Sequence, residues 1–452
     1  GVAGSENVQV KGPAQELPRL VDEVSRQVMQ RLLPARAADA WPPFELDLPS
    51  ARRFADTFKA MERRDWRTAQ AAAQEVIQRS PRFPVARLQL AMALGRLGQA
   101  GLAIEQFAMV RATLKPLPED AAKVIDVLQL AADPRRLAEA ADAAGALAKA
   151  YPERPGFLLD QAKLLTRAGQ VDQARVILTR PDWRQQAVGM RIPQLLALAD
   201  LYLQLGDPQQ ARVHARLAEK LATSAGSGWQ IEHASALAIE AESNVIQYES
   251  KADLSLFERA AREFEAAGDE IDALFMRVLA ESARPANAPG TTAKLEELLQ
   301  RARAGGYRRL EIDILRRVAF QHYVAGNMAE YRSRLSQALS VANAAGDTTA
   351  QQLLDLDLLN EDMAVGDFAS AEQRVQRLRD SGLRGDRAFW VAQFDSQLEF
   401  LRGRYDAALA ALERVATMQA EKSPLPPLPR ARLACSQADV LLAQGHAARA
   451  RD

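Results

Sequence analysis

Residues 195–207 read LLALADLYLQLGD, and Ala211 follows four residues later. Apolar residues at helical spacing run up to Gly206, which predicts a helix that ends there, because glycine readily takes the left-handed conformation of a helix stop. Ala211 then lies on a second helix, and its small side chain allows close packing against the first. The stretch therefore predicts a helix–turn–helix unit.

The same turn recurs along the chain as a glycine followed five residues later by an alanine. The further copies are Gly98 with Ala103, Gly169 with Ala174, Gly366 with Ala371, Gly403 with Ala408 and Gly445 with Ala450. Two degenerate copies keep the alanine but not the glycine: Arg64 stands in the glycine position before Ala69, and Asp133 stands there before Ala138. Successive turns lie 34 to 37 residues apart from position 64 to 206, and 37 to 42 apart from 326 to 445. The 120 residues between 206 and 326 fit three looser repeats.

A second marker is a glycine-containing stop at the end of the second helix of the later repeats. These stops contain Gly226, Gly268, Gly306, Gly346 and Gly382. One helical pair cannot bury its apolar face alone, so neighbouring pairs stack into a solenoid. The sequence predicts an all-α repeat solenoid of about ten or eleven units, rather than two or three globular domains.

The spacing and the glycine and alanine positions resemble the tetratricopeptide repeat over roughly residues 50–452. The resemblance implies a right-handed superhelix of helix–turn–helix repeats. We expect one array over residues 49–225 and a second over 226–452, with a truncated last repeat. The longer period of the second array resembles helical repeats in large bacterial signalling regulators, such as the maltose-regulon activator class.

The composition excludes several classes of function. The 58 basic and 58 acidic side chains give a net charge of zero, which argues against a surface for nucleic acid or anionic membrane. The lone Cys435 excludes a disulfide framework and a cysteine-based zinc site. Aromatic residues are only 6% of a chain that is 48% apolar, and alanine makes up much of the difference, which favours closely packed helices.

Residues 1–48 do not fit the repeat. The alternation of Asn7–Lys11 predicts a short strand, and apolar residues at helical spacing predict an amphipathic helix over 17–32. A proline-rich linker follows. The chain begins with Gly1 and stops at Asp452 within a helical pattern, so we expect a fragment of a longer protein. A link to a membrane is expected only through a segment missing from this sequence.

This order of strand, helix, linker and repeats is similar to the extracytoplasmic half of bacterial one-pass transmembrane Ser/Thr protein kinases. It is also similar to related one-pass transcriptional activators. The run Asp65-Trp66-Arg67-Thr68-Ala69 resembles the first repeat of those proteins. The resemblance implies a periplasmic or other extracytoplasmic sensor domain of an inner-membrane protein, and a cytoplasmic location is the alternative.

Catalytic signatures are absent from the sequence. It contains no phosphate loop, no His-Glu-x-x-His, no Gly-x-Ser-x-Gly and no kinase catalytic loop. The four histidines do not pair at a helical spacing of three or four residues, so no metal site is predicted. We expect no catalytic residues, no metal and no cofactor in this chain. The acidic stretch around Asp355, Glu361 and Asp362 is interpreted as a solvated helix face, with a docking patch as the alternative.

The tetratricopeptide resemblance also implies ligand-binding positions, which lie six and three residues before the turn glycine and one residue after it. These positions give the candidate partner-binding residues Lys163, Thr166, Gln170, Asp200, Asn360, Gln397, Phe400 and Arg404. Leu203, Asp207, Met363 and Asp367 occupy the same register. The mixture has no strong charge preference.

Three functions remain open from the sequence. The first is a non-catalytic interaction or sensor domain that binds a protein or peptide, with homodimerisation left open and no nucleic-acid partner. The second is the effector-sensing helical domain of a bacterial transcriptional activator. The third is an all-α enzyme, which a deep pocket with convergent perturbed carboxylates would favour.

Overall fold

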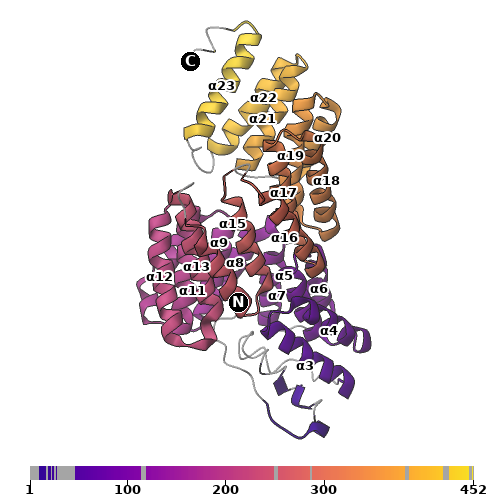
Figure 1. Ribbon diagram of the computed structural model, residues 1–452, viewed down its shortest axis with the longest axis vertical. Coiled ribbons are helices and arrows are strands. Elements are labelled where there is room, and N and C mark those ends of the chain that lie inside the picture. Colours follow the sequence, from indigo (N-terminus) through magenta and orange to yellow (C-terminus); the bar gives the residue numbers. More distant parts are fainter. Residues whose placement is uncertain are drawn as a thin grey trace. The chain divides into compact units, whose positions relative to one another are not determined.

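The computed structural model describes residues 10–16, 19–21, 23, 24, 27, 46–113, 119–248, 253–285, 288–381, 386–420, 427–446 and 450. Within these residues the chain is helical and contains no strand, so the prediction of an all-α fold is confirmed (Figure 1). No described helix combines the length and apolar character that a membrane span requires.

The helices follow one another as pairs that pack mainly on their neighbours in the chain. The first five pairs are α3 (Leu48–Glu62) with α4 (Trp66–Arg79), α5 (Pro84–Arg96) with α6 (Ala100–Thr113), α7 (Glu119–Ala132) with α8 (Leu137–Ala150), α9 (Pro155–Arg167) with α10 (Val171–Leu178), and α11 (Val188–Gln204) with α12 (Pro208–Ala225). The later pairs are α13 (Gln230–Tyr248) with α14 (Ser255–Ala266), α15 (Glu270–Ser282) with α16 (Thr291–Gly305), α19 (Thr348–Val365) with α20 (Phe368–Asp380), and α21 (Asp386–Leu401) with α22 (Tyr405–Ala420), followed by α23 (Pro427–Ala443). In the sequence, α17 (Arg308–Val324) and α18 (Met328–Ala345) lie between α16 and α19.

The turn glycines have the backbone conformation that the sequence predicts. Gly98, Gly169 and Gly206 have φ of 78°, 76° and 72°, a region that side chains with a Cβ rarely enter. In the degenerate first copy Arg64 takes the same conformation, with φ of 55°. The alanines five residues later, for example Ala69 and Ala211, are fully buried between the paired helices.

The copy at Asp133 departs from this rule. Asp133 caps a short 3-10 helix, Pro134–Arg136, by accepting a hydrogen bond from the Arg135 backbone N–H at 3.0 Å. Ala138 is only half-buried, and Ala140 and Ala141 supply the close contact instead.

The N-terminal prediction is tested in part. Val10 and Lys11 form no strand, and positions 7–9 of the expected strand lie outside the described residues. Residues 19–21, 23, 24 and 27 are helical, as the amphipathic pattern predicts, and the rest of that helix lies outside the described residues. Val21 is buried in the cluster that contains Phe54 and Phe83 of the first repeats.

The chain divides into two compact units. Unit 1 comprises residues 1–326 and 341–347, and unit 2 comprises residues 327–340 and 348–452. The helical pairs run on through residue 226, where the repeat period changes. The division into two arrays at that residue, like the right-handed superhelix, stays a prediction.

In unit 2 the acidic stretch is not a solvated face, and that interpretation is wrong. Asp355 is 7% exposed and Asp362 is fully buried. Arg374 of α20 donates to Asp355 and to Asp362, at 2.7 Å in each case. The hydrophobic pattern of α19 is weak because its buried side includes these carboxylates, whose charges are compensated by arginines of the next helix.

Candidate ligand-binding surface

Unit 1 carries a set of charged side chains on the first helices of its repeats, which we call the charged face. Its members are Asp160, Lys163 and Arg167 of α9, Asp200 of α11, Glu242 of α13, and Arg309 and Arg317 of α17. On α9 the three residues are spaced by three and four positions, so they share one side of the helix. The set spans repeats four to eight.

The carboxylates of the charged face lose hydration although solvent reaches them. Asp160 and Asp200 are exposed, yet surrounding protein raises the pKa of both carboxyl groups, and the charge of Lys163 opposes the rise. A group that is exposed and still desolvated has protein on several sides, as on a concave surface. Lys163 therefore lies within electrostatic reach of carboxylates on two successive repeats.

Glu242 is the most perturbed member of the charged face. Burial and, to a smaller extent, the negative charge of Asp200 raise the pKa of its carboxyl group to about 7 against the opposing charge of Arg317. Burial also lowers the pKa of Arg167, and the positive charge of Arg309 adds to that effect. Side chains of α9 and α13 thus interact with side chains of α17, four and two repeats further along the chain.

These charges are unusual because they are not neutralised locally. Among the residues that the structure describes, Asp160, Lys163, Asp200 and Glu242 make no salt bridge, whereas most other acidic clusters are ion-paired. Gln204 donates a long hydrogen bond of 3.5 Å to Asp200. A desolvated charge without a close partner is costly to the fold, so such a set is a candidate for recognising a ligand.

The structure brings two of the sequence-predicted residues together, Lys163 and Asp200. Thr166, on the same helix, is 2% exposed, and its hydroxyl donates to the Ala162 carbonyl at 2.9 Å, so it serves the helix. Gln170 is half-buried at the N-cap of α10. Asp207, in the same register, caps α12 by accepting from the Gln210 backbone N–H at 3.0 Å.

The remaining candidates lie in unit 2. Asn360 and Gln397 are exposed on α19 and α21. Phe400 is half-buried against Tyr405, with ring centroids 5.4 Å apart, in a cluster with Ala408 and Leu412. These positions do not gather into a set of interacting charges like that of unit 1.

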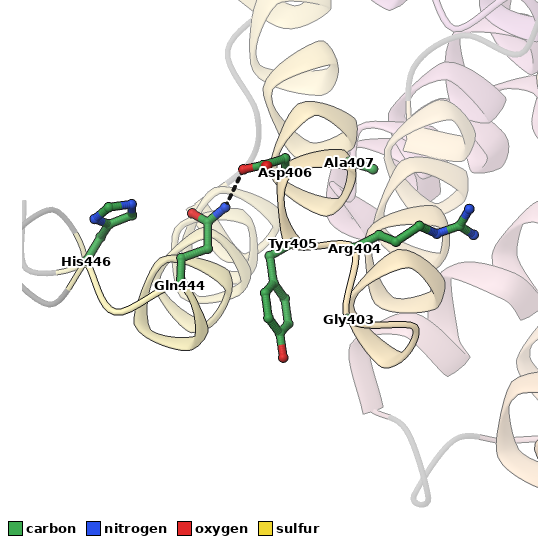
Figure 2. Close-up of a pocket in the computed structure, with 7 residues that line it drawn as sticks. All are labelled: Gly403, Arg404, Tyr405, Asp406, Ala407, Gln444 and His446. Carbon is green, nitrogen blue, oxygen red and sulfur yellow. Dashed lines mark hydrogen bonds between the residues drawn. The ribbon is translucent and has the colours of Figure 1, made fainter.

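Arg404 lines a pocket of about 550 Å³ beside the turn between α21 and α22 (Figure 2). Its guanidinium forms a salt bridge with Glu399 at 2.7 Å. Across the pocket the Gln444 amide donates to Asp406 at 2.7 Å, and Figure 2 shows the Arg404 side chain extending away from Gln444 and His446. Because Arg404 is paired with Glu399 and Asp406 accepts from Gln444, this pocket offers less to a charged ligand than the charged face.

Sequence reasoning missed Glu242 because its repeat lacks the regular turn. The sequence did contain a signal for an exposed aromatic pair on α17. Phe320 and Tyr323 lie six and three residues before Gly326, are 53% and 48% exposed, and stack with ring centroids 6.4 Å apart. The spacing rule, applied to Gly326, finds them. The described residues hold no cluster of His, Cys, Asp and Glu arranged for a metal ion.

No family model and no curated protein matches the chain. Among solved structures it is similar to a Rap protein complexed with Competence and Sporulation Factor, at 11% identity and a TM-score of 0.44, covering 81% of this chain and 94% of that one. It is similar to a signal transduction ATPase with a tetratricopeptide repeat sensor from Pyrococcus horikoshii, at 12% identity and a TM-score of 0.43, covering 96% and 70%. It is also similar to the tetratricopeptide domain of P58(IPK), at 14% identity and a TM-score of 0.29, covering 96% and 98%. The fold of the described residues is an all-helical repeat array.

Proposed function

We propose that this chain is a non-catalytic interaction domain that binds a protein or peptide on the charged face of unit 1. The observation that carries the proposal is the set Asp160, Lys163, Asp200 and Glu242, which is desolvated and makes no salt bridge among the described residues. Carboxylates and an ammonium group side by side suit a polypeptide, which offers both charges and many hydrogen-bonding groups.

A charge reversal tests the proposal. A peptide is selected from a displayed library against the protein, and its Kd is measured by fluorescence anisotropy. Lys163→Glu should weaken binding by about tenfold or more, which corresponds to roughly 1.4 kcal/mol, because a fourth negative charge joins the face. Lys149→Glu is the matched control, since Lys149 is exposed on the second helix α8.

Equal Kd values for the two lysine variants would remove the charged face as the binding site. Arg404→Glu extends the comparison to unit 2. If that variant, and not Lys163→Glu, weakens binding, the pocket beside α22 is the site instead.

We also propose that the domain senses a signal for a larger bacterial protein. The support is the resemblance of Asp65-Trp66-Arg67-Thr68-Ala69 and the segment before it to the extracytoplasmic part of transmembrane Ser/Thr kinases. The coding sequence upstream of Gly1 tests this. A kinase domain and a membrane helix there favour an extracytoplasmic sensor, and a winged-helix domain favours the effector-sensing part of a transcriptional activator.

One observation favours a second candidate function. A glutamate with a pKa of about 7, which interacts with the carboxylate of Asp200, whose pKa is also raised, has the properties of a general base. If the domain is an enzyme, mass spectrometry of a bound ligand should reveal a changed mass, and Glu242→Gln should abolish that change. Release of an unchanged ligand supports the interaction domain.

A further inference from the structure

Turns of the first two repeats of unit 1 contact turns of the sixth to eighth repeats. Asp269, which begins α15, is fully buried and bonded by two arginines from distant turns. Arg64, between α3 and α4, donates to its Oδ2 atom, and Arg96 at the end of α5 donates to the same atom at 3.2 Å. The two arginines precede Asp269 by 205 and 173 residues, so this is a contact between non-neighbouring repeats.

Backbone groups join the same two regions. The Arg308 N–H donates to the Leu97 carbonyl at 2.9 Å, which links the start of α17 to the end of α5. The Arg67 guanidinium donates to the Ala304 carbonyl at the end of α16. Arg96 also lies over the Trp66 ring, 5.5 Å from its centroid. Separate bonds from Arg64, Arg67, Arg96 and Leu97 thus hold the first two repeats against the later repeats.

Two glycines permit the close approach. A Cβ on Gly98 would lie 2.5 Å from the Arg309 backbone nitrogen, and a Cβ on Gly268 would lie 2.8 Å from the Arg63 carbonyl oxygen. Real Cβ atoms essentially never come so near to backbone atoms. By contrast, Gly169 and Gly206 occupy equivalent turns with φ of 76° and 72°, and nothing lies within 4 Å of a Cβ there.

The chemistry of this contact differs from that of the repeats themselves. Within a pair the helices bury alanine and leucine side chains, whereas ionic and backbone hydrogen bonds make the contact around Asp269. Burying a charge pair returns little net free energy, because both groups give up hydration. Opening this contact therefore costs far less than unfolding a repeat, and the helical pairs survive it.

We propose that the contact around Asp269 is a latch that closes repeats one to eight of unit 1 into a single turn, and that its opening admits a ligand to the charged face. The admission of a ligand rests on the proposed function, whereas the latch itself does not. Arg309, beside Gly98 at the latch, is itself a member of the charged face, so a ligand bound there lies next to the latch.

The first test removes the charge of Asp269 and keeps its other role. Asp269 also caps α15 by accepting from the Asp272 backbone N–H at 3.2 Å, and asparagine caps helices equally well. Asp269→Asn thus removes the charge that Arg64 and Arg96 share and keeps the cap, while the pair of Arg96 with Asp272 at 3.2 Å remains. Spin labels are attached to cysteines that replace the exposed residues Gln74 of α4 and Gln300 of α16. Cys435 is replaced by serine so that it takes no label, and the distance between the two labels is measured by double electron–electron resonance.

The wild type should give one narrow distance distribution, and Asp269→Asn a longer and broader one. Asp362→Asn is the matched control, because Asp362 is fully buried and bonded by Arg332 and Arg374, but within neighbouring repeats of unit 2. It should leave the distribution unchanged. If Asp269→Asn also leaves it unchanged while circular dichroism reports the same helicity, the latch does not depend on Asp269 and the proposal fails.

A glycine pair tests the latch without touching a charge. Gly98→Ala and Gly169→Ala impose the same backbone strain, since φ is 78° and 76° at the two turns. Only the alanine at 98 meets another repeat, so only that variant should broaden the distribution. Equal broadening in both would assign the effect to turn strain and overturn the proposal.

The last measurement concerns the ligand. With the peptide selected above, Asp269→Asn should raise the association rate constant by about tenfold, because the closed form no longer limits entry. An unchanged rate together with a broadened distance distribution refutes the gating clause. An effect of Asp269→Asn without any effect of Lys163→Glu refutes the charged face while the latch stands.

Discussion

Single residues of unit 1 are held in states that isolated side chains do not adopt. Glu242 is the clearest case, because its carboxyl group has a pKa of about 7 instead of 4.5. The folded protein therefore holds this proton at a pH at which the unfolded chain has released it. The contribution of Glu242 to stability is fully present below its ordinary pKa and is lost as the pH rises through about 7.

Glu242→Gln removes this dependence. The variant should melt at a higher temperature than the wild type at pH 8, by an amount equivalent to on the order of 1 kcal/mol, and the gain should shrink as the pH falls to 5. Thermal unfolding followed by circular dichroism at the two pH values measures it. Glu297→Gln, at an exposed position of α16, is the control and should change neither melt.

Arg64 holds the other unusual state, a left-handed backbone conformation where the regular repeats have glycine. That conformation costs a residue with a Cβ about 1 kcal/mol or more. The bond from its guanidinium to Asp269 gives a physical reason for arginine at this turn. From the sequence alone, Arg64 was recognisable only as a degenerate copy of the turn.

At the scale of the helices, the repeat assigns each turn residue one of two roles. The register one residue after the turn glycine was predicted to bind a ligand, but Asp207 caps α12 and Asp367 caps α20. The spacing rule cannot separate these roles, because a cap is defined by a hydrogen bond to the residue's own helix.

Asp207 decides between the two roles. Asp207→Ala should destabilise unit 1 by about 1 kcal/mol through loss of the cap, and Asp207→Asn should change stability little because asparagine is an equivalent cap. Hydrogen exchange of the first-turn amides of α12 measures the effect. If both variants leave exchange unchanged and both weaken the selected peptide, Asp207 is a ligand residue.

The sequence predicts the helices, the turns and the paired packing well, because each depends on residues fewer than about forty positions apart. Gly98, Gly169 and Gly206 and the buried alanines after them are examples. The charged face is different, since Glu242 and Arg317 come together only when distant repeats do. The spacing rule also does not show that Thr166 bonds within its own helix, where its hydroxyl donates to the Ala162 carbonyl.

At the scale of the molecule, the latch should respond to salt while the repeats do not. The side chains of Arg64 and Arg96 are 26% and 39% exposed, so ions reach them. The screening length falls from about 10 Å at 0.1 M salt to about 3 Å at 1 M. The distance between labels at Gln74 and Gln300 should lengthen over this range at constant helicity, and a constant distance would indicate that the backbone bonds and glycine contacts suffice.

A closed turn also constrains how such a chain can evolve. An open solenoid gains or loses a repeat by duplication or deletion at little cost, because each repeat touches only its neighbours. In unit 1, Asp269 must meet Arg64 and Arg96, so one repeat more or fewer between them would carry the partners out of reach. Related genes should therefore vary freely in length elsewhere and keep the number of repeats in this interval fixed.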